Sequence, residues 1–229
     1  ETLVKRHRRS LDSNMSKIDQ IYWLLEDCKR YGTLPFCGVA RAGFVAMEYL
    51  KGFEAIGIFS QDDYQAVMAS MSTVASRMKN SLQAMVRGEI ERSDFLHEYG
   101  HLRPGTYNIL SPRYDEDFQR HFGELKEERE RKSAHFELGQ SQEREIDEFL
   151  TSNGIEVTAL EIMSFIKVAI EGREYAKLVF TRSLSDAMVT LESLGQQCGL
   201  SRDEISHLNI RVVKQMYASL DALDLRDVL

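Results

Sequence analysis

The sharpest catalytic pattern in this sequence is a pair of histidines at 97–101, a segment that reads His-Glu-Tyr-Gly-His. In zinc peptidases this spacing puts two imidazoles on one helical face, with the glutamate beside the metal as general base. Here Gly100 lies inside the pattern and Pro104 follows closely, so the helix should end where a zinc helix has to continue. We therefore expect no stoichiometric zinc. A zinc-dependent hydrolase that uses His97 and His101 stays open as an alternative.

The second candidate is the irregular segment 100–114, which holds two of the three prolines and two glycines. Its backbone cannot be helical throughout, yet it also carries leucine, isoleucine, two tyrosines and two arginines, so we expect a packed and specific loop. Two guanidinium groups near an imidazole and a phenol suit an anionic or phosphorylated ligand. The alternative is that the same donors tie the loop to the helices through backbone carbonyls. The predicted substrate-binding residues are His101, Arg103, Tyr107 and Arg113.

Other patterns and the composition exclude several classes of protein. The sequence has no glycine-rich phosphate loop, no G-x-S-x-G elbow and no suggestive Cys–His pair, so we assign no catalytic residue. A basic cluster at 5–9 could contact phosphates, but 29 Lys+Arg against 36 Asp+Glu give a net charge of -7, which disfavours a nucleic-acid partner. No apolar run approaches the roughly 20 residues of a membrane span.

The three cysteines form no C-x-x-C pair, which is typical of a cytoplasmic protein. Cys28, Cys37 and Cys198 each fall in an apolar helical stretch, so we expect all three to be small buried side chains.

Helical periodicity dominates the rest of the chain, and no proline occurs after Pro112. Alternating strand-like runs and hairpin signals are missing from the sequence. We predict an all-α, helical bundle-like domain over 1–229, with 1–99 and 115–229 as candidate packed subdomains joined by the loop 100–114. Its capping signals pair Ser60 with Asp63, Thr158 with Glu161, and Ser201 with Glu204.

The expected helix boundaries follow from caps and 3–4 spacing. Within the longest helix, the apolar residues Phe180, Leu184, Ala187, Leu191, Leu194 and Cys198 are spaced 4, 3, 4, 3 and 4 apart and should form one buried stripe. A mixed-charge run at 124–132 predicts a solvated helix or a mobile connection. The expected helices run from Ser13 or Asn14 to Gly32, from Thr33 to about Phe53, from Ser60 through Met85, from Ser93 to Gly100, around 143–150, from Ala159 to about Cys198 with a bend or break near Gly172, and from Asn209 through Leu220.

The loop also carries a resemblance to a known family. Residues 98–107 read Glu-Tyr-Gly-His-Leu-Arg-Pro-Gly-Thr-Tyr, and 111–116 read Ser-Pro-Arg-Tyr-Asp-Glu. These segments resemble the central helical region of phosphoenolpyruvate synthase-like proteins, which are relatives of pyruvate phosphate dikinase and of the rifampicin phosphotransferases. Two weaker stretches, 173–182 and 199–204, also fit. One departure is Asn108, where the family pattern has aspartate.

The resemblance implies a part of a larger enzyme. Such proteins combine an ATP-grasp domain, a helical middle and a swivelling domain whose histidine carries the phosphoryl group. This sequence contains neither the nucleotide-binding domain nor the Thr-Ser-His motif after glycines, so it resembles the middle part alone, expected to be non-catalytic and cofactor-free by itself. ATP and Mg²⁺ are implied for the parent protein, as are the two partner domains and a small-molecule phosphoryl acceptor. A non-enzymatic helical interaction module is the other alternative.

Overall fold

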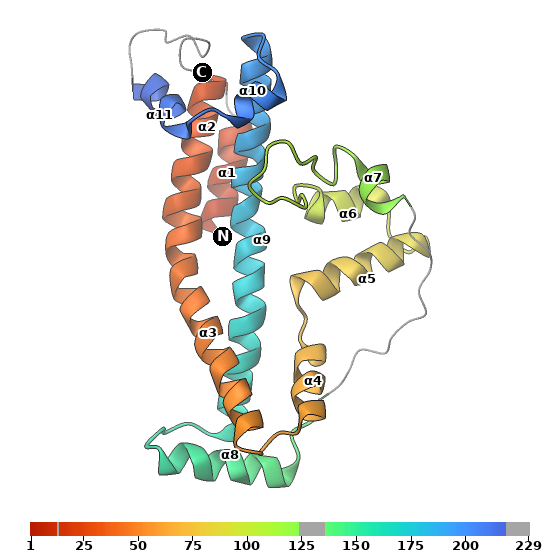
Figure 1. Ribbon diagram of the computed structural model, residues 1–229, viewed down its shortest axis with the longest axis vertical. Coiled ribbons are helices and arrows are strands. Elements are labelled where there is room, and N and C mark those ends of the chain that lie inside the picture. The colour runs from red at the N-terminus through yellow and green to blue at the C-terminus, as the bar shows by residue number, and fades with distance from the viewer. Residues whose placement is uncertain (13, 124–135, 219–229) are drawn as a thin grey trace. The chain divides into compact units, whose positions relative to one another are not determined.

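A computed structural model describes residues 1–12, 14–123 and 136–218, and these ranges contain helices but no strand (Figure 1). The predicted all-α, bundle-like fold is confirmed. Among the described helices, none is long and apolar enough to cross a membrane. The helices are α1 Thr2–Asp12, α2 Lys17–Asp27, the π-helix η1 Cys28–Thr33, α3 Leu34–Ala55, α4 Gln61–Ser70, α5 Val74–Val86, α6 Arg92–Tyr99, α7 Phe118–Phe122, α8 Gln140–Ser152, α9 Ala159–Gln197, α10 Arg202–Ser206 and α11 Ile210–Ala218.

The chain divides into two compact units, each made of separate segments. The first unit comprises Glu1–Pro35, Ser81–Glu127 and Lys177–Leu229, and the second comprises Phe36–Asn80 and Glu128–Ala176. This division differs from the expected boundaries. The loop 100–114 was expected to join two subdomains, but it lies inside the first unit. The chain instead passes between the units within helices, because α5 and α9 each contribute one part to the first unit and the other part to the second.

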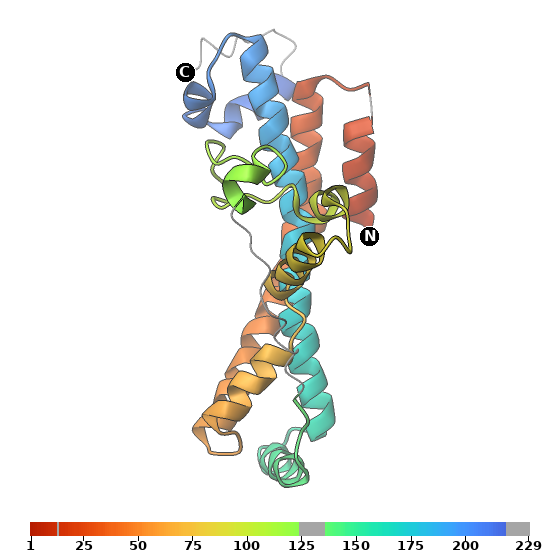
Figure 2. The ribbon, with the colours of Figure 1, turned by 90° about the vertical axis from the view of Figure 1, so that its right-hand side faces the viewer.

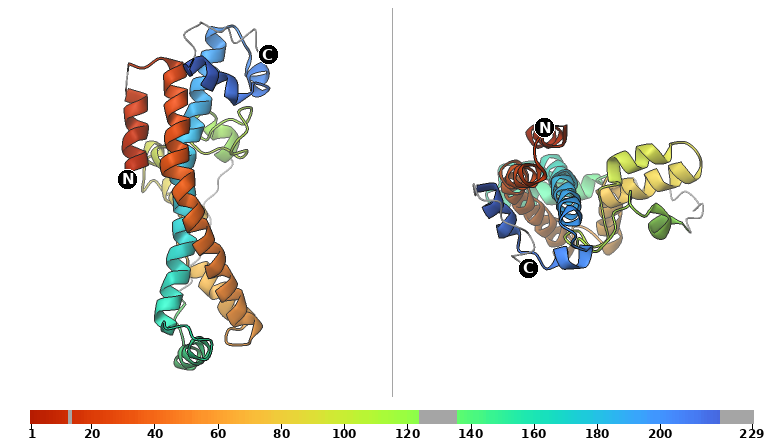
Figure 3. Two further views of the ribbon diagram at one scale, coloured as in Figure 1. Left: turned by 90° about the vertical axis from the view of Figure 1, so that its left-hand side faces the viewer. Right: turned by 90° about the horizontal axis from the view of Figure 1, so that it is seen from above.

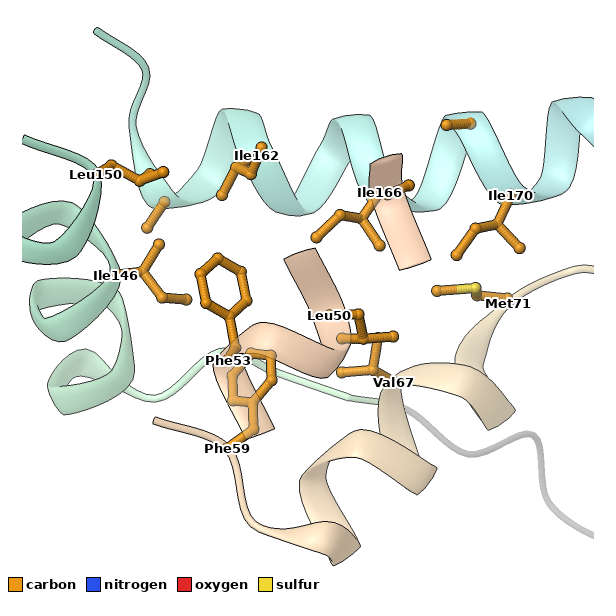
Figure 4. Packing of buried hydrophobic residues seen from close by; sticks show 13 residues of the cluster. Leu50, Phe53, Phe59, Val67, Met71, Ile146, Leu150, Ile162, Ile166 and Ile170 are labelled. Atoms are coloured by element: carbon orange, nitrogen blue, oxygen red, sulfur yellow. The ribbon is translucent and has the colours of Figure 1, made fainter. Parts of the chain in front are cut away.

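The second unit is built around a continuous apolar cluster from α3, α4, α8 and α9 (Figure 4). Phe53 lies in it with its ring edge-on to that of Phe59, at 5.7 Å between centroids and 80° between planes. The 3–4 spacing of apolar residues on these helices produces the cluster, since it turns one face of each helix inward. The buried members are Ala46, Leu50, Phe53, Phe59, Val67, Met71, Ile146, Leu150, Ala159, Ile162, Ile166, Ala169 and Ile170.

The expected helix from Ser60 through Met85 is interrupted. Ser60 and Asp63 form the predicted capping box, but α4 ends at Ser70 and α5 begins at Val74. At the break, the backbone N–H groups of Ser72 and Val74 donate to the carboxylates of Glu171 and Glu174, at 2.7 and 2.8 Å. These two carboxylates come from α9, so a tertiary contact caps α5 where periodicity alone predicted a continuous helix.

In the first unit, α1 and α2 lie side by side and α11 packs against α2 (Figures 2 and 3). The cap of α2 is Ser16, in a capping box with Asp19, and not the expected Asn14; Ser13 lies outside the described residues. The apolar cluster of this unit is smaller than that of the second. Its buried members are Ile21, Ile109, Leu191, Ile205 and Val213.

The expected stop at Gly32 is wrong, because α2 continues through η1 directly into α3. A Cβ built at Gly32 would lie 2.6 Å from Cβ of Phe180, so the glycine permits close packing on α9 and does not end a helix. Cys28, in η1, is buried and its thiol donates to the Phe180 carbonyl at 3.5 Å; burial raises its pKa to about 11. Cys37 is exposed and Cys198 half-buried, so the prediction that all three cysteines are buried is wrong.

The C-terminal helices follow the sequence closely. The capping boxes that begin α9 at Thr158 and α10 at Ser201 are confirmed, and α9 runs without interruption through Gly172. Asn209 caps α11 by accepting from the N–H of Arg211 at 3.0 Å. Along the predicted stripe, Phe180, Ala187 and Leu191 are buried, while its other members are partly buried. The mixed-charge run at 124–132 and residue 220 lie outside the described residues.

Candidate functional site

The loop that follows α6 lies against α9 within the first unit (Figure 1). His101 is one of its two buried anchors. Its imidazole is 4% exposed, and Nε2 lies 3.2 Å from the Leu178 carbonyl oxygen. Because a carbonyl only accepts, Nε2 carries the hydrogen and Nδ1 is left as an acceptor, buried and without a partner in the described part of the chain. Burial, reinforced by the charge of Arg182, lowers the pKa of His101 to about 4. The ring is therefore neutral at pH 7.

Arg103 is the second buried anchor, with 6% of its surface exposed. Its Nη1 donates to the carbonyls of Asn108 and Ser111 at 3.3 and 3.2 Å, and its Nη2 donates to Ser185 Oγ at 3.2 Å. The Ser185 hydroxyl in turn donates to the His101 carbonyl at 2.7 Å. Burial lowers the pKa of the guanidinium, but an arginine stays charged in a protein. Arg103 thus closes the loop on itself and ties it to α9.

Arg113 is the centre of a charged cluster at the end of the loop. Its Nη1 donates to Asp186 Oδ1 at 2.6 Å, while Nε and Nη2 donate to the two carboxylate oxygens of Asp115 at 2.9 and 2.6 Å. The other oxygen of Asp186 lies 2.7 Å from Nε2 of His7, which comes from α1. Burial alone would raise the pKa of Asp186, but the hydrogen bond from His7 and the charge of Arg113 together lower it. Three segments distant in sequence therefore meet at one carboxylate.

Arg182 of α9 holds the C-terminal end of α6. Its Nη2 donates to the carbonyls of His97 and Glu98 at 2.7 and 2.9 Å, which are among the carbonyls that a helix end leaves without partners. His97 is exposed on α6, whereas His101 is buried beyond the end of that helix. The two imidazoles do not share a helical face, and the described residues contain no group of three or more metal-ligating side chains. This geometry gives the zinc hydrolase no support.

The structure brings three of the four predicted binding residues together and leaves one apart. His101, Arg103 and Arg113 all donate hydrogen bonds to residues 178–186 of α9. In the described structure, Nδ1 of His101 and Nε of Arg103 are buried without a partner. Tyr107 instead is 66% exposed at the tip of the loop. The cluster can position the loop rigidly, and Tyr107 can contact a partner or ligand directly. Ligand binding by the four residues stays a prediction.

The sequence interpretation missed the residues that receive these bonds. Ser185 and Asp186 lie between apolar members of the α9 stripe, and His7, which bonds to Asp186, lies in the basic cluster at 5–9 that was considered only as a contact for phosphates. A signal was present: small polar side chains interrupt the apolar spacing of α9, and three of them are almost wholly buried. These are Thr181, Ser183 and Ser185, exposed by 5%, 1% and 4%.

The segments that carry the family resemblance contact each other in this unit. Arg182, in the stretch 173–182, bonds to Glu98 in the stretch 98–107. Arg202, in the stretch 199–204, donates to Glu116 in the stretch 111–116 at 3.3 Å and to Glu192 at 2.5 Å. Comparison with family models, with curated proteins and with solved structures gives no match to this chain.

Proposed function

We propose that this chain is the helical middle domain of a phosphoenolpyruvate synthase-like, ATP-dependent phosphotransferase. One observation carries the proposal: the resembling stretches are in contact through Arg182 and Arg202, which bond to residues 84 and 86 positions earlier in the chain. Residues retained for one structural purpose have a physical reason to meet in the fold, whereas chance similarities do not. The loop with its anchors on α9 would be the part that the family shares.

The proposal divides the loop residues into two roles. His101 and Arg103, both buried, hold the inner side of the loop against α9, and Arg113 joins its end to Asp186. Tyr107, which is exposed, makes the direct contact with a small-molecule phosphoryl acceptor or with a neighbouring domain. Rigid support beneath an exposed contact residue keeps a site in its productive geometry.

On this proposal the chain does not transfer phosphate alone. Phosphoryl transfer depends on charges placed around the transferring group and on bound metal ions. ATP and Mg²⁺ would bind an ATP-grasp domain of the parent protein, and a swivelling phosphohistidine domain would carry the phosphoryl group to the acceptor. The whole enzyme would work in the cytoplasm.

The test uses the longer polypeptide encoded around this segment. We expect its sequence to contain an ATP-grasp domain and a glycine-flanked Thr-Ser-His motif. Incubated with ATP carrying labelled phosphoryl groups, it should acquire an acid-labile, base-stable label on histidine, whereas residues 1–229 alone should acquire none. Flanking sequence without both domains, or a longer protein that is never labelled, would contradict the proposal.

A second measurement separates the binding role of the loop from its structural role. In the longer protein, Tyr107→Ala should leave histidine labelling intact but slow the loss of label on addition of a protein-free small-molecule extract of the source cells. Tyr31→Ala is the matched control, because Tyr31 is also exposed but lies outside the resembling stretches. Equal rates of label loss in the two variants would remove Tyr107 from the acceptor site.

A further inference from the structure

The second unit carries an apolar hollow of about 400 Å³ lined by α3 and α8. We propose that it binds a small aromatic molecule without negative charge. The proposal stands apart from phosphoryl transfer, because every lining residue belongs to the second unit and none to the loop cluster. The hollow is lined by Phe44, Val45, Glu48, Tyr49, Gly52 and Phe53 of α3 and by Phe149 of α8.

The floor of the hollow is fixed by the core. Phe53 is 1% exposed, and its ring is held edge-on by Phe59 on one side and by Phe149, at 6.1 Å and 85°, on another. Figure 4 shows Phe53 pointing into the packed cluster toward Ile146 of α8. Tyr49 also lines the hollow, and the centroid of its ring lies 6.1 Å from that of Phe53. A wall of rings already held in place binds a flat molecule without first losing side-chain freedom.

The rim leaves large apolar groups in water. Phe44 is 59% exposed and Val45 is 48% exposed, although they are neighbours on one helix. One face of the Phe44 ring is covered by the guanidinium of Arg173, at 5.0 Å from the centroid, which holds the ring in position. A ligand in the hollow would remove the exposed apolar surface of both residues from water.

Gly52 lines the hollow in the last turn of α3. A Cβ built at Gly52 meets no heavy atom within 4 Å in the described structure, so close packing does not require the glycine. Its missing side chain leaves room beside the lining rings, which a larger residue would occupy.

Charge and size decide the class of ligand. Glu48 is the charged residue among the lining groups, and its carboxylate lies at the surface, paired with Lys51 at 3.1 Å. Because Lys51 offsets the charge of Glu48, the aromatic faces decide the preference: they are negative, so they disfavour an anion and accept a neutral or cationic ring. The volume is at the small end of ligand sites, which span about 300–1,000 Å³. A stable protein interface buries about 800 Å² on each partner, more than a hollow of this size offers.

The test titrates residues 1–229 with N-phenyl-1-naphthylamine, a neutral dye that fluoresces on leaving water. We expect saturable 1:1 binding, and at least tenfold weaker binding of the anionic dye 8-anilino-1-naphthalenesulfonate. Gly52→Met should fill the space and weaken binding of the neutral dye at least tenfold. Gly38→Met is the matched control, because Gly38 lies on the same helix with equally open surroundings but outside the hollow, and it should change affinity less than twofold.

Two further variants keep the proposal testable if Gly52→Met disturbs the fold, which circular dichroism would reveal. Gly52→Ala should fold and weaken the neutral dye by a few fold, and Glu48→Gln should narrow the difference between the two dyes. The absence of saturable binding, or binding that no Gly52 variant weakens, would overturn the proposal. Self-association of the chain that Gly52→Met abolishes would also overturn it, by assigning the hollow to a second copy.

Discussion

The two units bury different kinds of groups. In the second unit the buried cluster is apolar throughout and draws on α3, α4, α8 and α9. In the first unit the apolar cluster is smaller, and every buried polar or charged residue of the described chain lies there. These buried polar residues are His7, Ser10, Asp27, Gln83, His101, Arg103, Thr181, Ser183 and Ser185.

The contrast follows from what each unit has to hold. Helices with apolar faces need only pack, and their stability depends on filled volume. A long loop instead brings backbone groups into the interior, and each needs a hydrogen-bond partner. Arg103 and Ser185 supply partners for the loop, at the cost of burying a charge. The second unit should therefore respond most to loss of volume, and the first to changes of charge and pH.

The largest expected effect is loss of volume in the second unit. Phe53→Ala should lower the free energy of unfolding by about 3–5 kcal/mol, because it leaves a cavity in a core where the ring is 1% exposed. Phe44→Ala, on the same helix but 59% exposed, should cost less than about 1 kcal/mol, mostly from the contact with Arg173.

Urea unfolding followed by two probes measures this difference. Circular dichroism reports on helices of both units, whereas the single tryptophan, Trp23, lies in α2 of the first unit. Phe53→Ala should shift the circular dichroism transition more than the Trp23 fluorescence transition. Equal costs for the two phenylalanines would break the comparison between the units.

Acid should act on the first unit through His101. Its pKa is about 4 in the folded protein and near 6.5 when unfolded, so between these values the unfolded chain binds a proton that the folded chain does not. The stability due to the neutral ring is complete above pH 6.5 and is lost as pH falls toward 4, by up to roughly 3 kcal/mol. His101→Gln keeps a donor for the Leu178 carbonyl and should lack this component. Unfolding free energies from pH 7 to pH 4 that run parallel in the two proteins would contradict the assignment.

A smaller effect is expected at the charged cluster. Asp186→Asn should cost about 1.5–3 kcal/mol at pH 7, because Arg113 and His7 lose a charged acceptor. Glu48→Gln removes a carboxylate paired only at the surface and should change stability by less than about 0.5 kcal/mol. If urea unfolding shows equal costs, the Asp186 cluster is no more than a surface ion pair.

The smallest effect on stability is expected at the tip of the loop. Tyr107→Ala should change the free energy of unfolding by less than about 0.5 kcal/mol, since the Tyr107 side chain is 66% exposed. Arg103→Ala, in contrast, should lower the melting temperature by several degrees, as the loss of about 1–2 kcal/mol would. Calorimetry on the two variants separates the loop's anchors from its exposed contact. A marked destabilisation by Tyr107→Ala would show that the tip, too, is structural.

Much of the fold could be predicted because its determinants are local. The capping boxes at Ser60, Thr158 and Ser201 each join residues three apart, so the chain needs no distant partner to begin those helices. The break between α4 and α5 escaped prediction for the opposite reason. There the caps are Glu171 and Glu174, about a hundred residues away, and no local pattern names them.

The sequence located the loop of the candidate site but did not predict how its residues are buried and paired. Residue types and the proline-glycine spacing marked His101, Arg103, Tyr107 and Arg113, but not which of them would be buried. The spacing along α9 puts Asp186 next to an apolar stripe and gives no sign of its partners. The structure shows that its carboxylate contacts Arg113 and His7. A guanidinium has the same donors whether it faces a ligand or a carbonyl, so sequence cannot separate a binding residue from an anchor.

The sequence by itself determined the helical class, the starts of α4, α9, α10 and α11, and the irregular loop, because backbone propensity and capping act over a few residues. Only the tertiary structure decided the rest. It determined which arginines bond to the loop and to α9, that Gly32 packs closely against Phe180, and that α9 contributes residues to both units. Those outcomes depend on contacts between residues far apart in the chain, and such contacts stabilise the protein only after the helices have packed.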